Sequence, residues 1–216
     1  MARDDLPLTD QLFLAAVDPR SGHLAVDPDL LGIGLAAVLL AQLENEGLIA
    51  ISTDGVVHQH GSRRPPTGVS PVITTAIGQI ADEPDDWNAQ VWLRFWATDR
   101  ITDRVAQRLE SVNVLLPATR RGLIHRKKVY RTVAESDQWW WRSRLRMFLT
   151  DPQRYTPTYM DLLMLGVGDA IGLRGVLLAD TTSVARDILE YTSSLPGSLG
   201  LLVRYTHVVA ADTTLT

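Results

Sequence analysis

The stretch RRGLIHRKKVYR, residues 120–131, holds the side chains best suited to bind an anionic partner. It carries six basic groups, including both lysines of the chain: Arg120, Arg121, Arg126, Lys127, Lys128 and Arg131. No Asp or Glu occurs between Glu110 and Glu135, so no neighbour in the sequence neutralises this charge. Because like charges repel, such a run favours either a solvated face or contact with phosphate groups.

A phospholipid surface is the first partner that these residues predict. Each basic group near an anionic bilayer contributes about 1 kcal/mol of attraction. The apolar pair Leu123 and Ile124 lies at the centre of the run, and we expect it to insert shallowly into the membrane. The predicted electrostatic contacts are Arg120, Arg121, Arg126, Lys127 and Lys128.

Two further hypotheses stay open. The same charges suit a nucleic-acid backbone, with the hairpin acting as the wing of a winged helix. Residues 103–113, just before that wing, have nearly balanced charge, so nucleic acid is not our first choice. The third hypothesis is self-association, in which the hairpin docks its cations on the acidic body of a neighbouring copy.

Other patterns point away from enzymatic chemistry. The segment Gly32–Ala37 matches the dinucleotide pattern G-x-G-x-x-A, but it falls inside an expected helix, where close helix packing explains the glycines better. His58 and His60 alternate on an expected strand without a third metal ligand nearby in the sequence. No G-x-S-x-G motif occurs. The sequence therefore predicts no enzyme, no cofactor and no metal site.

The composition predicts a cytoplasmic protein that contacts membranes peripherally. The formal net charge is −4, and without the six basic groups of residues 120–131 it would be about −10. The chain has no cysteine and no apolar segment typical of a signal peptide at its start. Its longest apolar run, Leu30–Ala41, is shorter than the roughly 20 residues that cross a bilayer, so it predicts a buried helix.

The fold class predicted is mainly α: a single compact multi-helix domain over residues 1–216, with small β-hairpins. Asp27 and Pro28 begin a helix that ends near Gly47. Thr9 is expected to cap an earlier helix, and HLAV to form a strand. The remaining segments are a hairpin over 48–60, a helix from 71, helices over 85–113 with a break near 98–99, strands over 114–133, and helices over 136–149, 157–170, 181–193 and 197–210. The order helix then hairpin occurs twice.

Several collinear segments together resemble the Golgi phosphoprotein 3 family, whose bacterial members are of this length. The segments are LPLTDQLFLAAVDPRSGHL, GLAAVLLAQLENEGLIAI, RRPPTG, LTDPQRY and DLLMLGVGDAIGLRGVLL. The resemblance covers nearly the whole chain. It implies a mainly helical domain that binds phosphatidylinositol 4-phosphate on a basic face, beside a hairpin that touches the membrane.

The resemblance also implies where the lipid headgroup contacts fall. The family's lipid-site tryptophan falls near Asp27, and an arginine of the small-residue helix falls near Ala36. Two arginines of a later helix fall near Asp99 and Thr102. The chain departs from the family pattern at all four positions. Arg100 and Arg104 lie close by and become the expected headgroup contacts.

Overall fold

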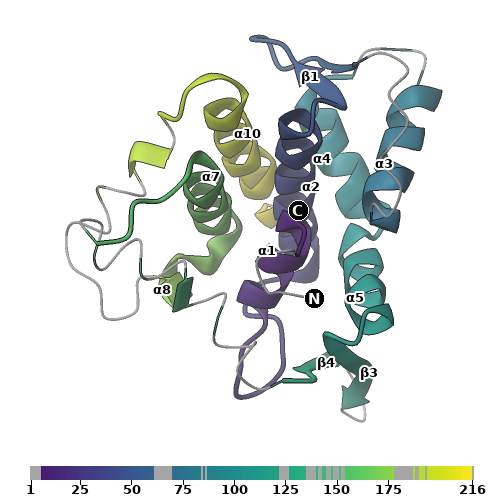
Figure 1. Ribbon diagram of the computed structural model, residues 1–216, viewed down its shortest axis with the longest axis vertical. Helices are drawn as coiled ribbons and strands as arrows, with labels where there is room; N and C mark the ends of the chain where they lie inside the picture. Colours follow the sequence, from purple (N-terminus) through teal and green to yellow (C-terminus); the bar gives the residue numbers. More distant parts are fainter. Residues whose placement is uncertain are drawn as a thin grey trace.

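The architecture is that of a computed structural model, which describes most of the chain (Figure 1). The described residues are 6–60, 70–83, 85, 87–121, 127–134, 140, 143–144, 147, 151, 154–177, 187, 190–192 and 194–215. Over these residues the protein is mainly helical, and its strands form two antiparallel two-stranded sheets. The predicted fold class is thus confirmed, whereas the single-domain assignment stays a prediction.

Helix α2 (Pro28–Asn45) forms the centre of the core. As expected, the Asp27 side chain caps it by accepting a hydrogen bond from the Asp29 amide, 2.8 Å, and Pro28 occupies its first turn. The helix is apolar on all sides, which requires neighbours all round. It packs against α1 (Leu8–Ala16), α4 (Ala89–Thr98) and α10 (Gly197–Thr214).

The glycines of the G-x-G-x-x-A pattern serve this packing. A Cβ placed on Gly32 would lie 3.1 Å from the Ala97 Cα, and one on Gly34 would lie 2.8 Å from the Ile171 Cδ1. Both positions are buried within α2, so the backbone of α4 and the side chain of Ile171 can approach closely. The prediction of close helix packing is confirmed.

Further helices flank this centre on two sides (Figure 1). On one side lie α3 (Pro71–Asp82), which begins at the predicted residue and is capped by the Ser70 side chain, and α5 (Ile101–Ser111). On the other side, next to α10, lies α7 (Tyr159–Gly168), which continues through the π-helical turn η2 (Asp169–Leu173) into α8 (Arg174–Leu177). The predicted break between two helices near 98–99 is confirmed, because α4 ends at Thr98.

Two hairpins extend the helices at opposite ends of the molecule (Figure 1). Strands β1 (Ile49–Ile51) and β2 (Val57–Gln59) follow α2, and strands β3 (Leu115–Arg121) and β4 (Lys127–Thr132) follow α5. The predicted repetition of helix then hairpin is therefore confirmed as a repeated topology.

Some local predictions were wrong. Thr9 is not the cap of α1, because the helix begins at Leu8, whose amide donates to the Gln42 side chain, 3.1 Å. The segment HLAV forms only an isolated bridge between Val17 and Leu24, since no neighbouring strand extends the pairing. The helices predicted over 136–149 and 181–193 fall largely outside the described residues.

In the part of the chain that the structure describes, none of the helices combines the length and the apolar character that crossing a bilayer requires.

Candidate functional site

The β3–β4 hairpin brings cationic residues opposite one another. Its register pairs Arg120 with Lys128 and Arg121 with Lys127. Directly opposed residues of an antiparallel pair have their Cβ atoms about 4.5–5.5 Å apart, a spacing at which like charges destabilise a sheet. The hairpin therefore concentrates positive charge at the end of the molecule beyond α5 (Figure 1).

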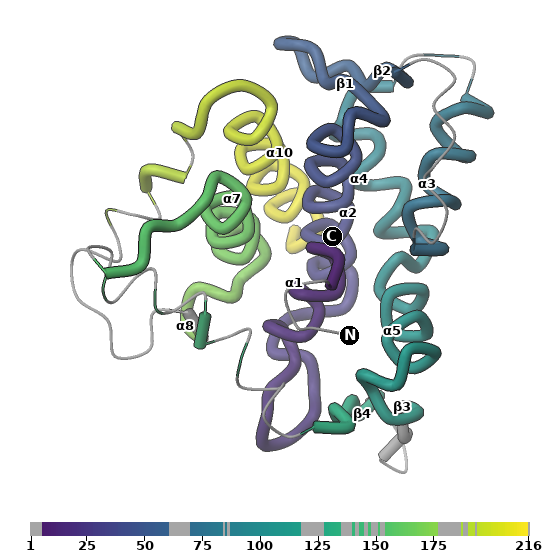
Figure 2. The backbone as a smooth tube through the Cα atoms, in the orientation of Figure 1, coloured from purple at the N-terminus to yellow at the C-terminus, as the bar shows by residue number. Residues whose placement is uncertain are grey.

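The loop between α1 and α2 anchors strand β4 to the body (Figure 2). The Tyr130 amide donates to the Gly22 carbonyl, 2.7 Å, and the His23 Nδ1 lies 3.2 Å from the Lys128 carbonyl oxygen. Gly22 has a φ of 71°, and a Cβ there would lie 2.6 Å from the Tyr130 carbonyl oxygen. Only glycine fits this close approach without displacing the strand.

Tyr130 ties the base of the hairpin to the core. Its ring packs edge-on against Phe13, with ring centroids 5.1 Å apart, and its side chain is almost fully buried. Burial, and then the negative charges of Asp103 and Glu110, raise the pKa of Tyr130 to about 12. The phenol therefore stays neutral across the physiological pH range.

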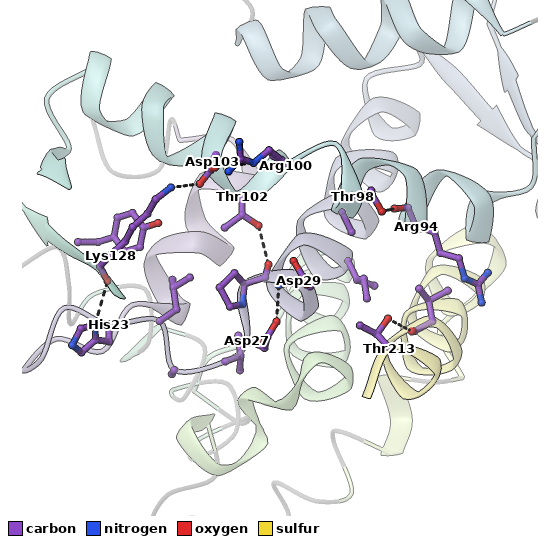
Figure 3. A pocket seen from close by; sticks show the side chains of 18 of the residues that line it. His23, Asp27, Asp29, Arg94, Thr98, Arg100, Thr102, Asp103, Lys128 and Thr213 are labelled. Atoms are coloured by element: carbon purple, nitrogen blue, oxygen red, sulfur yellow. Dashed lines mark hydrogen bonds and ion pairs between the residues drawn. The ribbon is translucent and has the colours of Figure 1, made fainter. Parts of the chain in front are cut away.

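A pocket of about 1200 Å³ adjoins the hairpin and reaches the start of α2 (Figure 3). Its charged lining residues are four aspartates and three cations: Asp27, Asp29, Asp103 and Asp212 against Arg94, Arg100 and Lys128. Among these charged residues, with four negative and three positive groups, the formal balance is −1. The pocket is therefore not a basic cavity.

Each of the three cations that line this pocket forms a salt bridge with an aspartate. Asp103 accepts from the Lys128 ammonium through one carboxylate oxygen, and its other oxygen lies 3.3 Å from the Arg100 Nε. The Arg94 guanidinium lies 2.6 Å from the Asp212 carboxylate. The charges of the pocket are thus largely compensated within the protein.

Three of the predicted lipid contacts consequently have partners on the protein itself. Besides Lys128 and Arg100 on Asp103, Arg104 pairs with Asp99 at 2.5 Å. Arg100 still exposes 80% of its side chain. These pairings differ from the expected free positive surface and reduce the charge that the three residues offer; their roles in lipid binding stay predictions.

The other predicted contacts divide into two groups. Arg120, Arg121 and Lys127 lie on the paired strands, where their backbone register is described. Leu123, Ile124 and Arg126 lie outside the described residues, as does the tip that connects the strands.

The structure places the four positions that the family resemblance assigns to the headgroup in different surroundings. Asp27 and Thr102 both line the pocket, and the Thr102 hydroxyl donates to the Pro28 carbonyl, 3.1 Å. Asp99 accepts from Arg104 and from the Gln79 amide, 2.9 Å. Ala36 is fully buried within α2. Asp27 and Thr102, from two distant segments, thus line one pocket, and none of the four positions carries a cation.

Sequence reasoning missed the residues that set the charge of this pocket. Asp103 lies in the first turn of α5, three positions after the cap residue Arg100, and this spacing is a usable signal for an ion pair. Asp212 and Arg94 are 118 residues apart, so no local pattern joins them.

A buried ion pair, also missed, holds α5 against α1. The Arg108 guanidinium pairs with the Asp10 carboxylate, and the two side chains expose only 11% and 0% of their surface. Burial lowers the pKa of Arg108, although the adjoining carboxylate favours its charged form. The second oxygen of Asp10 has no hydrogen-bond partner among the described residues. The helix that carries the basic hairpin is thus fixed by a desolvated pair of charges.

A comparison with known protein families shows which family the chain belongs to. The family model of Golgi phosphoprotein 3 (GPP34) matches residues 8–197. The chain belongs to the Golgi phosphoprotein 3 family. The matched span includes both hairpins and all pocket-lining residues except those of α10. No match was found among curated proteins. As a member of this family, the protein presents an acid-containing pocket beside a basic hairpin.

Proposed function

We propose that the protein is a peripheral membrane protein that docks on anionic phospholipid through the β3–β4 hairpin. The observation that carries this proposal is the register of the hairpin, which sets two pairs of cationic residues opposite each other. The acid-free segment between Glu110 and Glu135 adds to it, because no carboxylate of the hairpin itself balances those charges.

Electrostatic attraction sets the expected strength of membrane binding. Each basic residue near an anionic bilayer contributes about 1 kcal/mol, and opposed like charges in a sheet are unfavourable without a counter-ion. Phosphate headgroups relieve that repulsion while binding the protein. Arg120, Arg121 and Lys127 are the main contacts in this account, and Lys128 contributes less because Asp103 already pairs with it.

The preferred lipid is defined by charge rather than by a single headgroup. The pocket that contains two of the family's expected headgroup positions is lined by more aspartates than cations. A multiply charged phosphoinositide would face those carboxylates. We therefore propose attraction to anionic bilayers in general, with phosphatidylinositol 4-phosphate as one of several suitable lipids.

Co-sedimentation with vesicles tests the proposal. The protein is expected to pellet with phosphatidylcholine vesicles that contain phosphatidylserine, and to stay in the supernatant with phosphatidylcholine alone. High salt should release it, because the Debye length falls from about 10 Å at 0.1 M to about 3 Å at 1 M. Equal pelleting with both kinds of vesicle would contradict the proposal.

A matched pair of variants locates the contact. Replacing Arg120, Arg121 and Lys127 with Ser should abolish pelleting. The control removes the same charge from exposed arginines of the body, Arg94, Arg154 and Arg204, and should pellet like the unaltered protein. If both variants weaken binding equally, net charge and not the hairpin governs it. Binding to random duplex DNA instead of vesicles would support the nucleic-acid hypothesis.

A further inference from the structure

A second pocket, of about 290 Å³, lies beside the β1–β2 hairpin, at the end of the molecule opposite the basic hairpin (Figure 1). Strand β2, the last turn of α3 and the start of α4 contribute to its walls. Its volume is at the lower end of the range for ligand pockets, so it suits a small molecule. The lining side chains with polar or aromatic groups are His58, Gln59, Glu83, Asp85, Trp87 and Trp92.

The charge of this second pocket is negative. Glu83 and Asp85 contribute two carboxylates, and none of the lining residues is Lys or Arg. Neither carboxylate forms a salt bridge within the part of the chain that the structure describes. The larger pocket has its own arginines and lysine to compensate its aspartates, whereas these two carboxylates are left to attract a cation from solution.

The end of helix α3 adds to this negative potential. Ile80 and Ala81 of its last turn line the pocket, and Glu83 follows the helix as its cap residue. The carbonyl groups at the C-terminus of a helix act as roughly half a negative charge. No basic residue lies in the last turn of α3 to balance it. The helix dipole and the two carboxylates therefore favour a cation at the same place.

Trp87 gives the pocket an aromatic wall. Its ring is held against Trp92 and Phe95, with ring centroids 4.9 and 5.7 Å away, and its carbonyl accepts from the Val57 amide, 3.0 Å. Among aromatic side chains, the indole ring binds cations best. A half-buried indole that is fixed in the same pocket as two carboxylates is thus a suitable surface for an organic cation.

Trp92 contributes a hydrogen-bond donor that lacks an acceptor. It lines the pocket and exposes only 2% of its surface, and its Nε1 has no hydrogen-bond partner among the described residues. A buried indole N–H usually has a partner, as Trp96 has in the Gln79 side chain, 2.8 Å away. The unmet donor of Trp92 points to a ligand that carries a hydrogen-bond acceptor besides its positive charge.

We propose that this pocket binds a small organic cation, a guanidinium or ammonium compound that also carries a hydrogen-bond acceptor. Glu83 and Asp85 pair with the cation, Trp87 packs against it, and the Trp92 N–H donates to the acceptor. Over the described residues, no group of three or more His, Asp or Glu side chains is placed to hold a metal ion. The site is separate from the basic hairpin, so its test does not depend on membrane binding.

The probe is 4-guanidinobutyramide, which combines a guanidinium group with an amide carbonyl. The protein is labelled with ¹⁵N-tryptophan, and its six indole N–H signals are followed by NMR while the probe is added. Two of these signals should shift and saturate, and one of the two is the signal that Trp87→Phe removes. That variant should bind the probe about threefold more weakly. The neutral analogue 4-ureidobutyramide has the same shape without the charge and should cause no shift.

A matched pair of double variants locates the site. Glu83→Gln combined with Asp85→Asn removes both carboxylates and should weaken binding of the probe at least about tenfold. Asp29→Asn combined with Asp212→Asn removes the same charge from the larger pocket and should leave the affinity unchanged. All four replacements keep the size of the side chain, and thermal unfolding checks that each double variant is folded.

Four other outcomes would overturn the inference. The lack of any saturable shift would mean that the pocket does not bind the probe. Equal shifts with the neutral analogue would show that shape and not charge governs the contact. Loss of binding only in the variant of Asp29 and Asp212 would place the cation in the larger pocket. Shifts of the same two indole signals by Ca²⁺ at lower concentration would assign the carboxylates to a metal ion.

Discussion

The two hairpins share a local design but differ in what they carry. Each follows a helix whose end is succeeded, two residues on, by a residue in the left-handed region: Gly47 at φ 68° after α2 and Asn113 at φ 57° after α5. The next amide closes the same bond in both places, from Leu48 to the Leu43 carbonyl and from Val114 to the Leu109 carbonyl, each 2.9 Å. These are two Schellman-type ends.

The difference lies in charge and in how each hairpin is held. The β1–β2 turn is tied to the body by polar contacts, since Asn88 donates to the Asp54 carbonyl, 2.8 Å, and Tyr205 donates to the same carbonyl, 3.2 Å. The β3–β4 hairpin is anchored at its base by Tyr130 and carries opposed cations above it. A common local geometry thus supports one hairpin that caps the helical body and one whose register sets cationic residues opposite each other.

The helices that precede the two hairpins, α2 and α5, also differ in how they are held. Asp10→Ala tests this difference and is expected to change the free energy of unfolding most. Both helices bury apolar residues, but α5 is in addition held by the buried pair of Arg108 with Asp10. Removing Asp10 leaves a buried guanidinium uncompensated, so the free energy of unfolding should fall by about 3–5 kcal/mol in urea titration. The exposed pair gives the control, because Asp212→Ala should cost about 1 kcal/mol or less. Equal losses would show that burial does not matter.

The anchor of the basic hairpin is tested next by Gly22→Ala. The new Cβ would meet the Tyr130 carbonyl oxygen at 2.6 Å in a left-handed backbone, so unfolding free energy should fall by at least about 2 kcal/mol. Gly78→Ala is the control, since no atom lies within 4 Å of a Cβ there and alanine should stabilise α3 by about 0.5–1 kcal/mol. If the Gly22→Ala protein is as stable as the unaltered one, the close approach of Gly22 to Tyr130 does not anchor the hairpin.

Unlike the preceding substitutions, which weaken the protein, Asp103→Asn is expected to strengthen its binding to membranes. Asp103→Asn would release Lys128 and Arg100 from their shared carboxylate. Binding to phosphatidylserine-containing vesicles should then tighten, by roughly fivefold for each cation that reaches the bilayer, as measured by sedimentation. Asp212→Asn changes the net charge equally and should have a smaller effect. If the two variants behave alike, the pairing on Asp103 does not limit the hairpin.

Substitutions at Gly47 and Asn113, the left-handed residues that follow α2 and α5, are expected to change the free energy of unfolding least. Asn113→Gly should raise the free energy of unfolding by about 0.5–1 kcal/mol, because glycine adopts a positive φ more readily. Gly47→Ala should lower it by about 1 kcal/mol for the same reason. Thermal unfolding measures both. A loss of stability in Asn113→Gly would mean that the asparagine side chain makes a contact that outweighs its backbone cost.

Sequence reasoning succeeded where the signal was local. The cap at Asp27, the start of the helix at Pro71 and the break after Thr98 all follow from residues within a few positions of the element that they define. Thr9 was misassigned because Gln42, 34 residues away from Leu8 in sequence, satisfies the first amide of α1. The helix predicted over 157–170 ends too early, because the chain continues through η2 into α8, with Gly172 at φ 95° between them.

The candidate site was predictable in part for the same reason. The cationic run is continuous in sequence, and its strands pair as expected. The pairing of Lys128 with Asp103 joins residues 25 positions apart, and that of Arg108 with Asp10 joins residues 98 positions apart. Such long-range charge partners depend on the packing of helices, which composition and periodicity do not specify.

The central claim is that the basic hairpin binds lipid through charge. The most direct test compares binding to two vesicle preparations of equal surface charge, one containing phosphatidylserine and the other phosphatidylinositol 4-phosphate. We predict equal, salt-sensitive binding to both, and its loss when Arg120, Arg121 and Lys127 are replaced with Ser. Undiminished binding of that variant, or strong binding confined to phosphatidylinositol 4-phosphate, would contradict the account.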